Sequence, residues 1–526
     1  MGLRRREFLK VSAATAASLS LGPGCTTLGG QPGPSPFQHG VASGDPLGDR
    51  VILWTRVTPP PGETGALSVA WRVARDPGLR DVVARGEASA EPGSDYTVKV
   101  DAAGLEPGSS WYYAFEALGQ ASPRGRTRTL PSDSPERVRL AFCSCSCLPW
   151  GFFNAYAHLA RRDDLDAVLH LGDYLYEYAN GSYGDGSDIG RVPLPDREIV
   201  SLADYRQRHA QYKADPDSQA MHARHPLIAI WDDHELANDA WKGGAANHQP
   251  EEGGWPERRE NAVRAYFEWM PIREQSGSAA PVIYRGFRFG DLVDLSMLDT
   301  RLVGRDRPVS REERAALADP QRSILGHDQE RWLFDRLAAS QRDGVAWRVL
   351  GQQVMLAPVR RSDGSVLSTD KWDGYPACRQ RLFDSLLRNG VRDTVVLTGD
   401  IHSSWALDLA PDPFRPGGYD RSTGRGSLGV EFAAPGISAP GIPDSEENAR
   451  VSADILAANP HVRWVDFLHQ GYAVLDIDRE RAQCDWYHLD AVRERPSAER
   501  FARGFRTLRG RQRLEEASAP IPSFRG

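Results

Sequence analysis

Two hydrophobic patterns follow one another along the chain. Over residues 37–132, short runs rich in β-branched and aromatic residues, such as RVILWTRV, LSVAWRVA and SSWYYAFEAL, are separated by turn residues. Short strands at this spacing predict a β-sandwich. A tyrosine corner, the feature that closes fibronectin-like sandwiches, is indicated by Leu105, Pro107, Gly108 and Tyr112. We therefore expect this part of the chain to be a fibronectin-like β-sandwich.

After the segment LPSDSPE the pattern changes, because apolar runs now alternate with helical segments. The runs are VRLAFCS, DAVLHLGD, PLIAIWDDHE, LVDLSMLD, AWRVLGQQV and DTVVLTGDIH, and each ends in polar residues. Strands that alternate with helices predict a layered α/β domain, which we place at residues 137–490. We expect this domain to fold separately from the sandwich, with the join near residues 130–137.

The carboxyl ends of these runs carry the candidate chemistry. In layered α/β sheets, functional residues gather outside the carboxyl ends of the strands, so the polar residues that end the runs should meet. They are Cys145, Asp173, Asp232, Asp233, His234, Asn238, Asp299, Gln352, Gln353, Asp400 and His402. Carboxylates, imidazoles, amides and a thiolate in one place are typical of a metal site.

Length and charge narrow the possible partners. The chain has 526 residues and a formal net charge of −7. A chain of this length exceeds one ordinary core, which favours two domains. Because no basic surface is indicated, we expect no specific nucleic-acid partner. We expect the protein to be a monomer.

The N-terminus has the features of an export signal. The twin arginine, Arg5 and Arg6, is followed by EFLK and by a short, mildly apolar run. This arrangement is typical of a twin-arginine signal, and the run is too short to span a bilayer durably. Cys25, after LGPG, is a candidate for lipid attachment. Residues 1–36 are thus expected to be a signal and tether read by the twin-arginine export machinery, and the mature chain to be periplasmic, secreted or lipid-anchored.

Three of the six cysteines stand at alternate positions in AFCSCSCLPW. If the preceding strand continued through them, Cys143, Cys145 and Cys147 would lie on one face. A disulfide between residues two apart is geometrically poor. Three interpretations remain open: buried core thiols, disulfides to Cys378 or Cys484, and a thiolate metal ligand at the end of the strand.

The order of the motifs resembles that of a known family. FCSCS, HLGDYLYEY, WDDHELAND, LGQQVM and LTGDIHSSW, after a sandwich and a twin-arginine signal, are similar to the motifs of PhoD-type alkaline phosphatases and phosphodiesterases. These enzymes belong to the calcineurin-like metallophosphoesterases. The resemblance extends from Phe37 to about Asp490, and it implies a layered α/β/β/α catalytic domain with a multinuclear site that holds Fe³⁺ and Ca²⁺.

The resemblance also implies metal ligands. The iron ligands correspond to Cys145, Asp173, Tyr176 and His402, with Cys147 as the rival of Cys145. Cys143 is then a buried neighbour, and Asp173 bridges the metals. Calcium ligands correspond to Asn238 and Asp400. Thiolate, phenolate and imidazole suit iron, whereas hard oxygen ligands suit calcium.

Catalytic roles follow from the same resemblance. Asp233 and His234 correspond to the catalytic pair, in which Asp233 orients or ligates and His234 donates a proton to the leaving oxygen. The resemblance gives Gln352 and Gln353 no role. The arginine-rich tail, residues 491–526, is compatible with a helix, and the family implies such a helix near the site entrance.

The expected activity is hydrolysis of phosphate mono- and diesters, lipid and nucleotide phosphates among them, by a metal-activated hydroxide that attacks phosphorus in line. Because residues 37–132 alone assemble no catalytic groups, the alternative is a non-catalytic exported binding or adhesion lipoprotein on the same domains. The intact Asp173, His234, Asp400 and His402 argue against this alternative.

Overall fold

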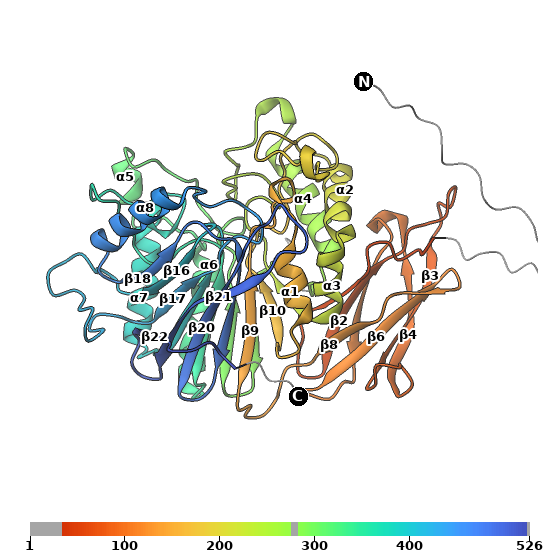
Figure 1. The fold of residues 1–526 in the computed structure, drawn as a ribbon, viewed down its shortest axis with the longest axis horizontal. Coiled ribbons are helices and arrows are strands. Elements are labelled where there is room, and N and C mark those ends of the chain that lie inside the picture. Colours follow the sequence, from red (N-terminus) through yellow and green to blue (C-terminus); the bar gives the residue numbers. More distant parts are fainter. Residues whose placement is uncertain (1–33, 275–281, 523–526) are drawn as a thin grey trace, which may run out of the picture. The chain divides into compact units, whose positions relative to one another are not determined.

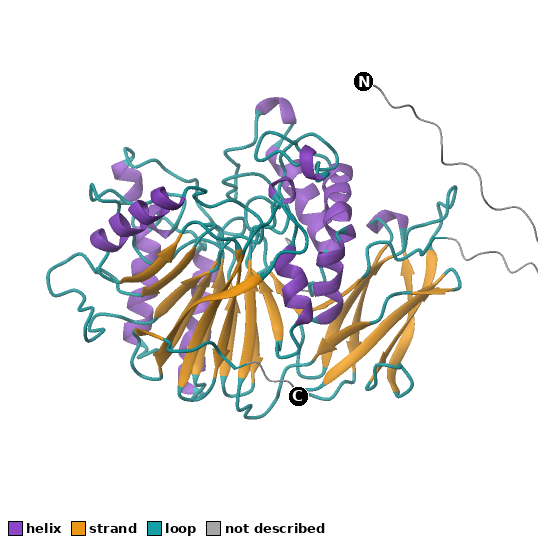
Figure 2. Cartoon of the chain, in the orientation of Figure 1, coloured by secondary structure: helices purple, strands orange, loops and turns teal. Residues whose placement is uncertain are grey.

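Three β-sheets form the framework of the computed structural model, which describes residues 34–274 and 282–522 (Figures 1 and 2). The residues from Pro36 onward form one structural unit. The expected signal sequence and Cys25 lie outside the described residues.

The largest sheet has ten strands in the order β22-β21-β20-β19-β9-β10-β11-β1-β2-β5. Its members are β1 (Val41–Gly44), β2 (Arg50–Arg56), β5 (Thr97–Ala103), β9 (Val138–Cys143), β10 (Ala167–His170), β11 (Pro226–Ala229), β19 (Gly471–Ile477), β20 (Arg481–Leu489), β21 (Glu499–Leu508) and β22 (Leu514–Glu516). The first three apolar runs of the layered part form β9, β10 and β11, which are parallel to one another.

The second sheet has seven strands in the order β12-β13-β14-β15-β17-β16-β18. Its members are β12 (Arg285–Phe289), β13 (Val293–Met297), β14 (Trp347–Gln352), β15 (Thr394–Thr398), β16 (Ser404–Asp408), β17 (Val430–Ala433) and β18 (Val462–Asp466). The pairs β13–β14, β14–β15 and β15–β17 are parallel.

The two large sheets share a core, and helices cover their other faces. Alternation along the strands divides the side chains: Val349 and Val395 belong to the core that includes β9–β11, whereas Leu350 and Val396 belong to the core with α6 and α7. The helices are α1 (Asn154–Arg161), α2 (Leu202–Ala214), α3 (Pro216–Arg224), α4 (Trp255–Trp269), α5 (Arg314–Leu317), α6 (His327–Arg342), α7 (Pro376–Arg388) and α8 (Ser445–Ala458). The predicted α/β/β/α layering is confirmed.

Local signals set the ends of the helices beside the ten-stranded sheet. The Ser201 hydroxyl accepts a hydrogen bond from the backbone N–H of Asp204, which closes a capping box at the start of α2. The next helix, α3, begins with Pro216 directly after the N-cap Asp215. Proline suits this position because the first helical N–H has no partner within the helix.

The third sheet pairs β4-β3-β6-β7, with β8 added to β6, and packs on the N-terminal strands of the largest sheet. Its members are β3 (Leu67–Ala74), β4 (Val82–Ala90), β6 (Ser110–Ala117), β7 (Gln120–Ala121) and β8 (Gly125–Arg128). Trp111 and Tyr113 fill the shared core, so the N-terminal sandwich is confirmed. The prediction of a tyrosine corner is wrong, because the strand register turns Tyr112 outward, where Arg124 lies over its ring.

The separate folding of the two domains is also wrong. The join near residues 130–137 does lie between β8 and β9, but β1 pairs in parallel with β11 through Ser43 and Gly44. One sheet therefore runs from the sandwich into the layered part. The physical reason is that β11 would otherwise present an open edge of unpaired backbone groups. A buried ion pair of 2.6 Å between Asp45 and Arg285 supports the same junction.

The arginine-rich tail forms strands instead of the expected helix. β21 pairs with β20 along its whole length, and β22 pairs with β21. Alternation places Phe505 in the core while its neighbour Arg506 faces outward, and Leu514 is buried as well. The tail thus completes an edge of the largest sheet.

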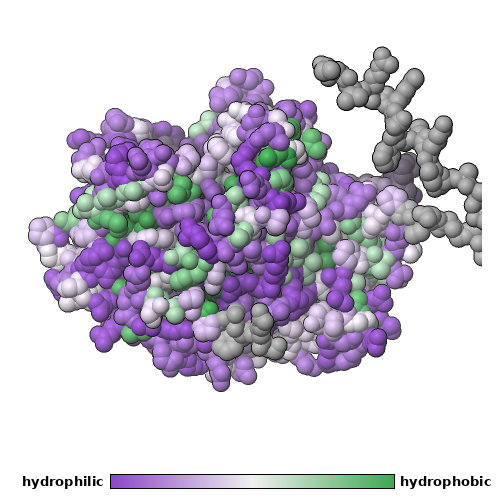
Figure 3. All heavy atoms as spheres, viewed as in Figure 1, coloured by the Kyte–Doolittle hydropathy of each residue, from purple (hydrophilic) through white to green (hydrophobic). Residues whose placement is uncertain are grey.

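The surface of the unit is mainly polar on the face shown in Figure 3, where hydrophobic residues occur in small groups between hydrophilic ones. Within residues 34–274 and 282–522, none of the helices combines the length and the hydrophobicity needed to cross a membrane.

Candidate active site

The carboxyl ends of the parallel strands bring the predicted residues together. Cys145 follows β9, Asp173 follows β10, Asp233 follows β11, and Asp400 follows β15. Four predicted metal ligands have left-handed backbone conformations, with φ of 65° at Cys145, 54° at Asp173, 59° at Asp400 and 51° at His402. Such conformations are costly for residues other than glycine and persist where the surrounding structure enforces them, often at functional sites.

One group contains the predicted soft ligands. Ligand atoms of Cys145, Asp173 and His402 all lie within 4.8 Å of one another. The Tyr176 hydroxyl lies 3.2 Å from Asp173 Oδ2, to which it donates a hydrogen bond, and 3.1 Å from His402 Nε2. The thiol, the phenol, the imidazole and the carboxylate expected to hold iron therefore converge.

The donor set fits a cation. Burial, followed by the Asp173 carboxylate, raises the pKa of both the Cys145 thiol and the Tyr176 hydroxyl well above their usual values. Burial lowers the pKa of His402 to about 4, and His402 Nδ1 lies 3.2 Å from the Pro440 carbonyl, so a neutral ring directs Nε2 toward the group. A bound cation would favour the deprotonated thiol and phenol, because it supplies the positive charge that this buried set lacks.

The other cysteines have different surroundings. Because β9 ends at Cys143 and Cys145 turns left-handed, the strand does not continue and the three thiols do not share one face. Cys143 is buried against the Leu169 carbonyl, and Cys147 Sγ lies 3.9 Å from the Tyr183 carbonyl. The five cysteines in the described residues are all free, so the disulfide interpretation is wrong for them.

His234 belongs to a second group with Asp173 and Asp233. Its Nδ1 lies 2.7 Å from Glu177 Oε2, and both side chains are buried. The second oxygen of Glu177 accepts hydrogen bonds from the Asn238 backbone N–H (2.7 Å) and the Asn247 amide (2.9 Å). The side chain that orients the imidazole through Nδ1 is thus Glu177, whereas the prediction gave Asp233 an orienting or a ligating role.

Carboxylates control the charge of His234. Burial alone would lower its pKa, but Glu177, Asp173 and Asp233 raise it well above the usual value. For Glu177, burial acts to raise the pKa, yet the contact with His234 holds it below the usual range. Both directions favour an imidazolium paired with a carboxylate.

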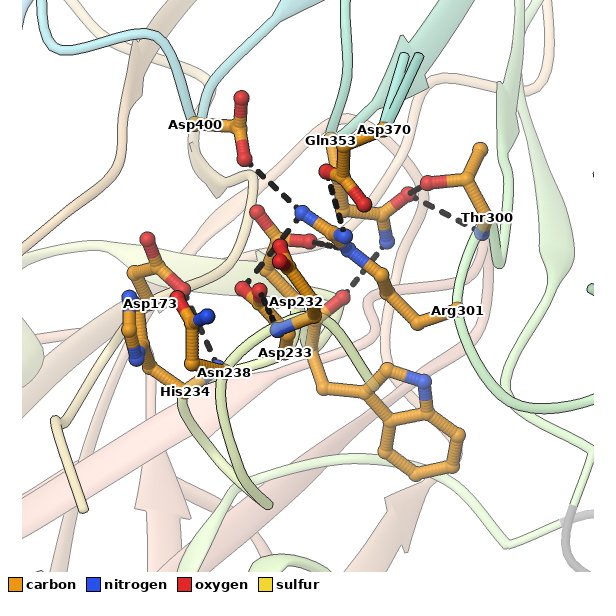
Figure 4. Close-up of polar contacts among 12 residues, drawn as sticks. Asp173, Asp232, Asp233, His234, Asn238, Thr300, Arg301, Gln353, Asp370 and Asp400 are labelled. Carbon is orange, nitrogen blue, oxygen red and sulfur yellow. Dashed lines mark hydrogen bonds and ion pairs between the residues drawn. The ribbon is translucent and has the colours of Figure 1, made fainter. Parts of the chain in front are cut away.

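A third group contains Asp232, Asp233 and Asp400 (Figure 4). The fully buried Arg301 lies among them. Its Nη2 is 2.8 Å from Asp400 and 3.5 Å from Asp233, and its Nε forms an ion pair with Asp232. Lys371 contacts the other oxygen of Asp400. The guanidinium and the ammonium hold the carboxylates in place against their mutual repulsion.

The remaining predicted residues have supporting positions. Asn238 is half-buried in the loop after His234. The Gln353 amide donates to the carbonyls of Trp231 (2.6 Å) and Leu298 (3.0 Å), and its oxygen accepts from Thr300. Gln352 bonds to Thr398 and Trp372. Both glutamines therefore connect neighbouring strands, or the loops that follow them, by hydrogen bonds. The Asp299 carboxylate accepts hydrogen bonds from backbone N–H groups of its own loop.

Several residues that contact the predicted site residues were missed by sequence reasoning. Glu177, Arg301 and Lys371 lie in loops, where no hydrophobic periodicity marks them. Arg301 does follow the apolar run of β13, so its place near a strand end was a usable signal. Glu235, within the noted WDDHE motif, accepts backbone N–H groups of Asp173 (3.1 Å), Tyr174 (2.6 Å) and Asp232 (2.8 Å) and joins two loops of the site.

A fourth potential ligand group, Asp466, His469 and His488, has internal partners. Arg500 donates to His469 Nε2 at 2.8 Å, and Ser404 bonds His488 Nε2 at 3.0 Å. The two imidazole rings are stacked 14° from parallel, a geometry in which they cannot both point at one ion. This group is therefore a hydrogen-bonded cluster.

Comparison with known proteins agrees with this arrangement. The family described as PhoD-like phosphatase matches residues 140–486, and the PhoD-like phosphatase N-terminal domain matches residues 24–131. Alkaline phosphatase D of Bacillus subtilis (strain 168) is 37% identical over 522 residues, covering 93% of this chain and 85% of that protein. A solved structure of PhoD has a TM-score of 0.82 and 34% identity, and the match covers 94% of each chain. The protein is a metal-dependent phosphoesterase, and the chain belongs to the PhoD-like phosphatase family.

Proposed function

We propose that the chain is an exported enzyme that hydrolyses phosphate mono- and diesters at the site formed by the three linked groups, with iron in the soft group and calcium near Asp400. The observation that carries the proposal is that Asp173 belongs both to the group with Cys145 and His402 and to the group with Asp233 and His234. A carboxylate shared in this way is suited to bridge two cations.

The ligand types support the choice of metals. Thiolate, phenolate and imidazole favour a transition metal, and this set comes from Cys145, Tyr176 and His402. Asp400 and Asn238 offer hard oxygen atoms, which favour calcium. Cys145 is a better candidate than Cys147, whose thiol lies against the Tyr183 carbonyl.

The residues of the chain divide the chemical work. Bound metal ions would activate a water molecule as the nucleophile and neutralise charge on the phosphate. His234 would donate a proton from Nε2 to the leaving oxygen, while Glu177 holds Nδ1 and stabilises the imidazolium. Arg301 and Lys371 hold Asp400, and Glu235 fixes the loops that carry Asp173 and Asp232.

Export by the twin-arginine route is supported by the paired arginines and the sequence EFLK. This route carries folded proteins, so the site would be loaded with metal before it reaches an oxidising compartment. The mature protein would then be periplasmic, secreted or anchored through Cys25.

Elemental analysis of the protein purified after export tests the metals. We expect iron and calcium, with a broad visible band from Tyr176 bound to ferric iron. Removal of calcium should abolish activity and leave the band. Zinc alone, with no colour and full activity, would overturn the choice of metals and spare the phosphoesterase activity.

A further inference from the structure

Three half-buried aromatic side chains, Trp150, Tyr178 and Tyr183, form a surface beside the proposed acid, which we name the aromatic wall. Their rings contact one another, with centroids 6.1 Å apart for Trp150 and Tyr183 and 5.7 Å apart for Tyr178 and Tyr183. The Tyr183 ring is also stacked on that of the buried ligand Tyr176, at 5.7 Å and 17°. The wall thus continues the site toward solvent with flat rings.

The wall lies on one side of the reacting groups. The centroid of Tyr178 is 5.5 Å from that of His234, and Tyr183 is 6.3 Å from His234 with its ring 17° from parallel. The Tyr183 hydroxyl is 3.4 Å from His402 Nδ1. The cationic side chains Arg301 and Lys371 instead contact Asp400. The rings therefore flank the group that protonates the leaving oxygen, where the leaving alcohol must lie.

The wall is held in shape by contacts that no catalytic step uses. Gly184 has no side chain, and a Cβ there would lie 2.6 Å from Trp150 Nε1, so the glycine makes room for the indole. Arg493 donates to the carbonyls of Trp150 (3.3 Å) and Asp185 (3.3 Å) and contacts Asp188, which links the two loops that carry the wall. A binding surface built in advance loses little conformational entropy when a ligand arrives.

We propose that the aromatic wall is a leaving-group subsite for phosphate esters whose alcohol carries a planar aromatic ring, with a nucleoside as the expected alcohol. This inference rests on the proposed function of the site. Flat rings bind a nucleobase by stacking, which tolerates different bases because every base has a π-face. A flexible polyol would need several hydrogen-bonding side chains, and the wall contributes mainly aromatic surface.

A pair of substrates that differ only in the base tests the subsite. Adenosine 5′-phosphate and ribose 5-phosphate share the same reacting ester, so their ratio of kcat/KM isolates the contribution of the base. We expect the metal-loaded full chain to prefer adenosine 5′-phosphate by about 5- to 100-fold. Tyr183→Leu should reduce this preference to about 2-fold or less, and Tyr183→Phe, which removes only the hydroxyl, should retain most of it.

Binding without turnover gives a second measurement. Calorimetric titration should detect adenosine binding to the wild type, no comparable binding of ribose, and at least a 5-fold weaker binding of adenosine to Tyr183→Leu. Tyr112→Leu removes a half-exposed tyrosine far from the site and should change neither result. Hydrolysis of both phosphates at equal rates, or a preference unchanged in Tyr183→Leu, would overturn the subsite while leaving the phosphoesterase intact. If neither ester were hydrolysed and adenosine still bound in a Tyr183-dependent way, the subsite would stand and the proposed function would fail.

Discussion

Replacing Glu177 by glutamine should weaken His234 as the proposed general acid without changing the size of either side chain. The Glu177 oxygen that faces away from His234, Oε1, accepts two hydrogen bonds, from the Asn238 backbone and the Asn247 amide, and this fixes which end of a glutamine would face His234. The NH₂ group would point at Nδ1. Nδ1 would then have to accept a hydrogen bond, which requires a neutral imidazole.

The magnitude follows from the charge-assisted contact. Glu177 Oε2 and His234 Nδ1 are 2.7 Å apart and buried. A hydrogen bond to a charged group is worth about 1.5–3 kcal/mol, which corresponds to roughly one to two pKa units. Because the carboxylates raise the pKa of His234, its acid form persists as pH rises until that pKa is passed. In Glu177→Gln, the acid form should be lost about one to two pH units earlier.

Rate profiles against pH, measured with an alkyl phosphate and with a nitrophenyl phosphate, provide the assay. For the alkyl ester we expect kcat to fall by about 10- to 100-fold at alkaline pH. The alkaline limb of the pH profile should move to lower pH. The nitrophenyl ester should change little, because its leaving group scarcely needs a proton. The double variant Glu177→Gln/His234→Ala should be no slower than His234→Ala, since Glu177 acts through the imidazole. Equal losses on both esters, or additive losses in the double variant, would refute the role of the pair. Glu431→Gln alters a buried carboxylate that accepts hydrogen bonds from Thr398 and from the backbone of residues 356 and 357, and it is the control for the loss of a buried charge.

Five further changes test the roles of the site residues and of the C-terminal strands. Asp173→Asn should lose metal and nearly all turnover, measured by elemental analysis and kcat, and full metal content would contradict a bridging role. His234→Ala should keep its metal and lose roughly 100- to 10,000-fold on alkyl esters but less on nitrophenyl esters. Cys145→Ser should remove the visible band and Cys147→Ser should preserve it; the reverse result would exchange the two ligands. Deletion after Asp490 removes buried Phe505 and Leu514 and should lower the free energy of unfolding by about 3–6 kcal/mol; a denaturant curve equal to that of the full chain would show that β21 and β22 contribute little.

The sequence predicted the layers because they depend on local patterns. Apolar runs of strand length that alternate with helical segments reappear as β9, β10, β11, β13, β14 and β15. The sandwich was likewise predicted from short strand-like runs separated by turn residues. The domain division failed because the pairing of β1 with β11 joins residues far apart in the chain, and no local pattern records which strand edges meet. The prediction of a helix in the tail failed for a related reason. An arginine-rich segment becomes a strand only where a partner such as β20 is available.

The site shows the same division between nearby and distant information. Asp173, His234, Asp400 and His402 could be found because they end apolar strands, and parallel strands bring such ends to one edge of a sheet. Glu177 could not be found in this way, because its function depends on a contact with His234, 57 residues later in the chain. Arg301 is similar, since its charge matters only through the aspartates that three other loops place around it.

The sequence by itself determined the layered architecture, the presence of a metal-binding set at strand ends and the family of the chain. Periodicity, motif order and residue chemistry are properties of the sequence itself, and they do not depend on how distant segments pack. The tertiary structure alone decided that one sheet unites the sandwich with the catalytic layers, that Cys145 and not Cys147 faces Asp173, and that Glu177 contacts His234, the proposed acid. These outcomes depend on where the backbone turns after each strand, as at Cys145 and Asp173 with their left-handed conformations. Such turns are imposed by packing between distant segments, and packing exists only once the chain has folded.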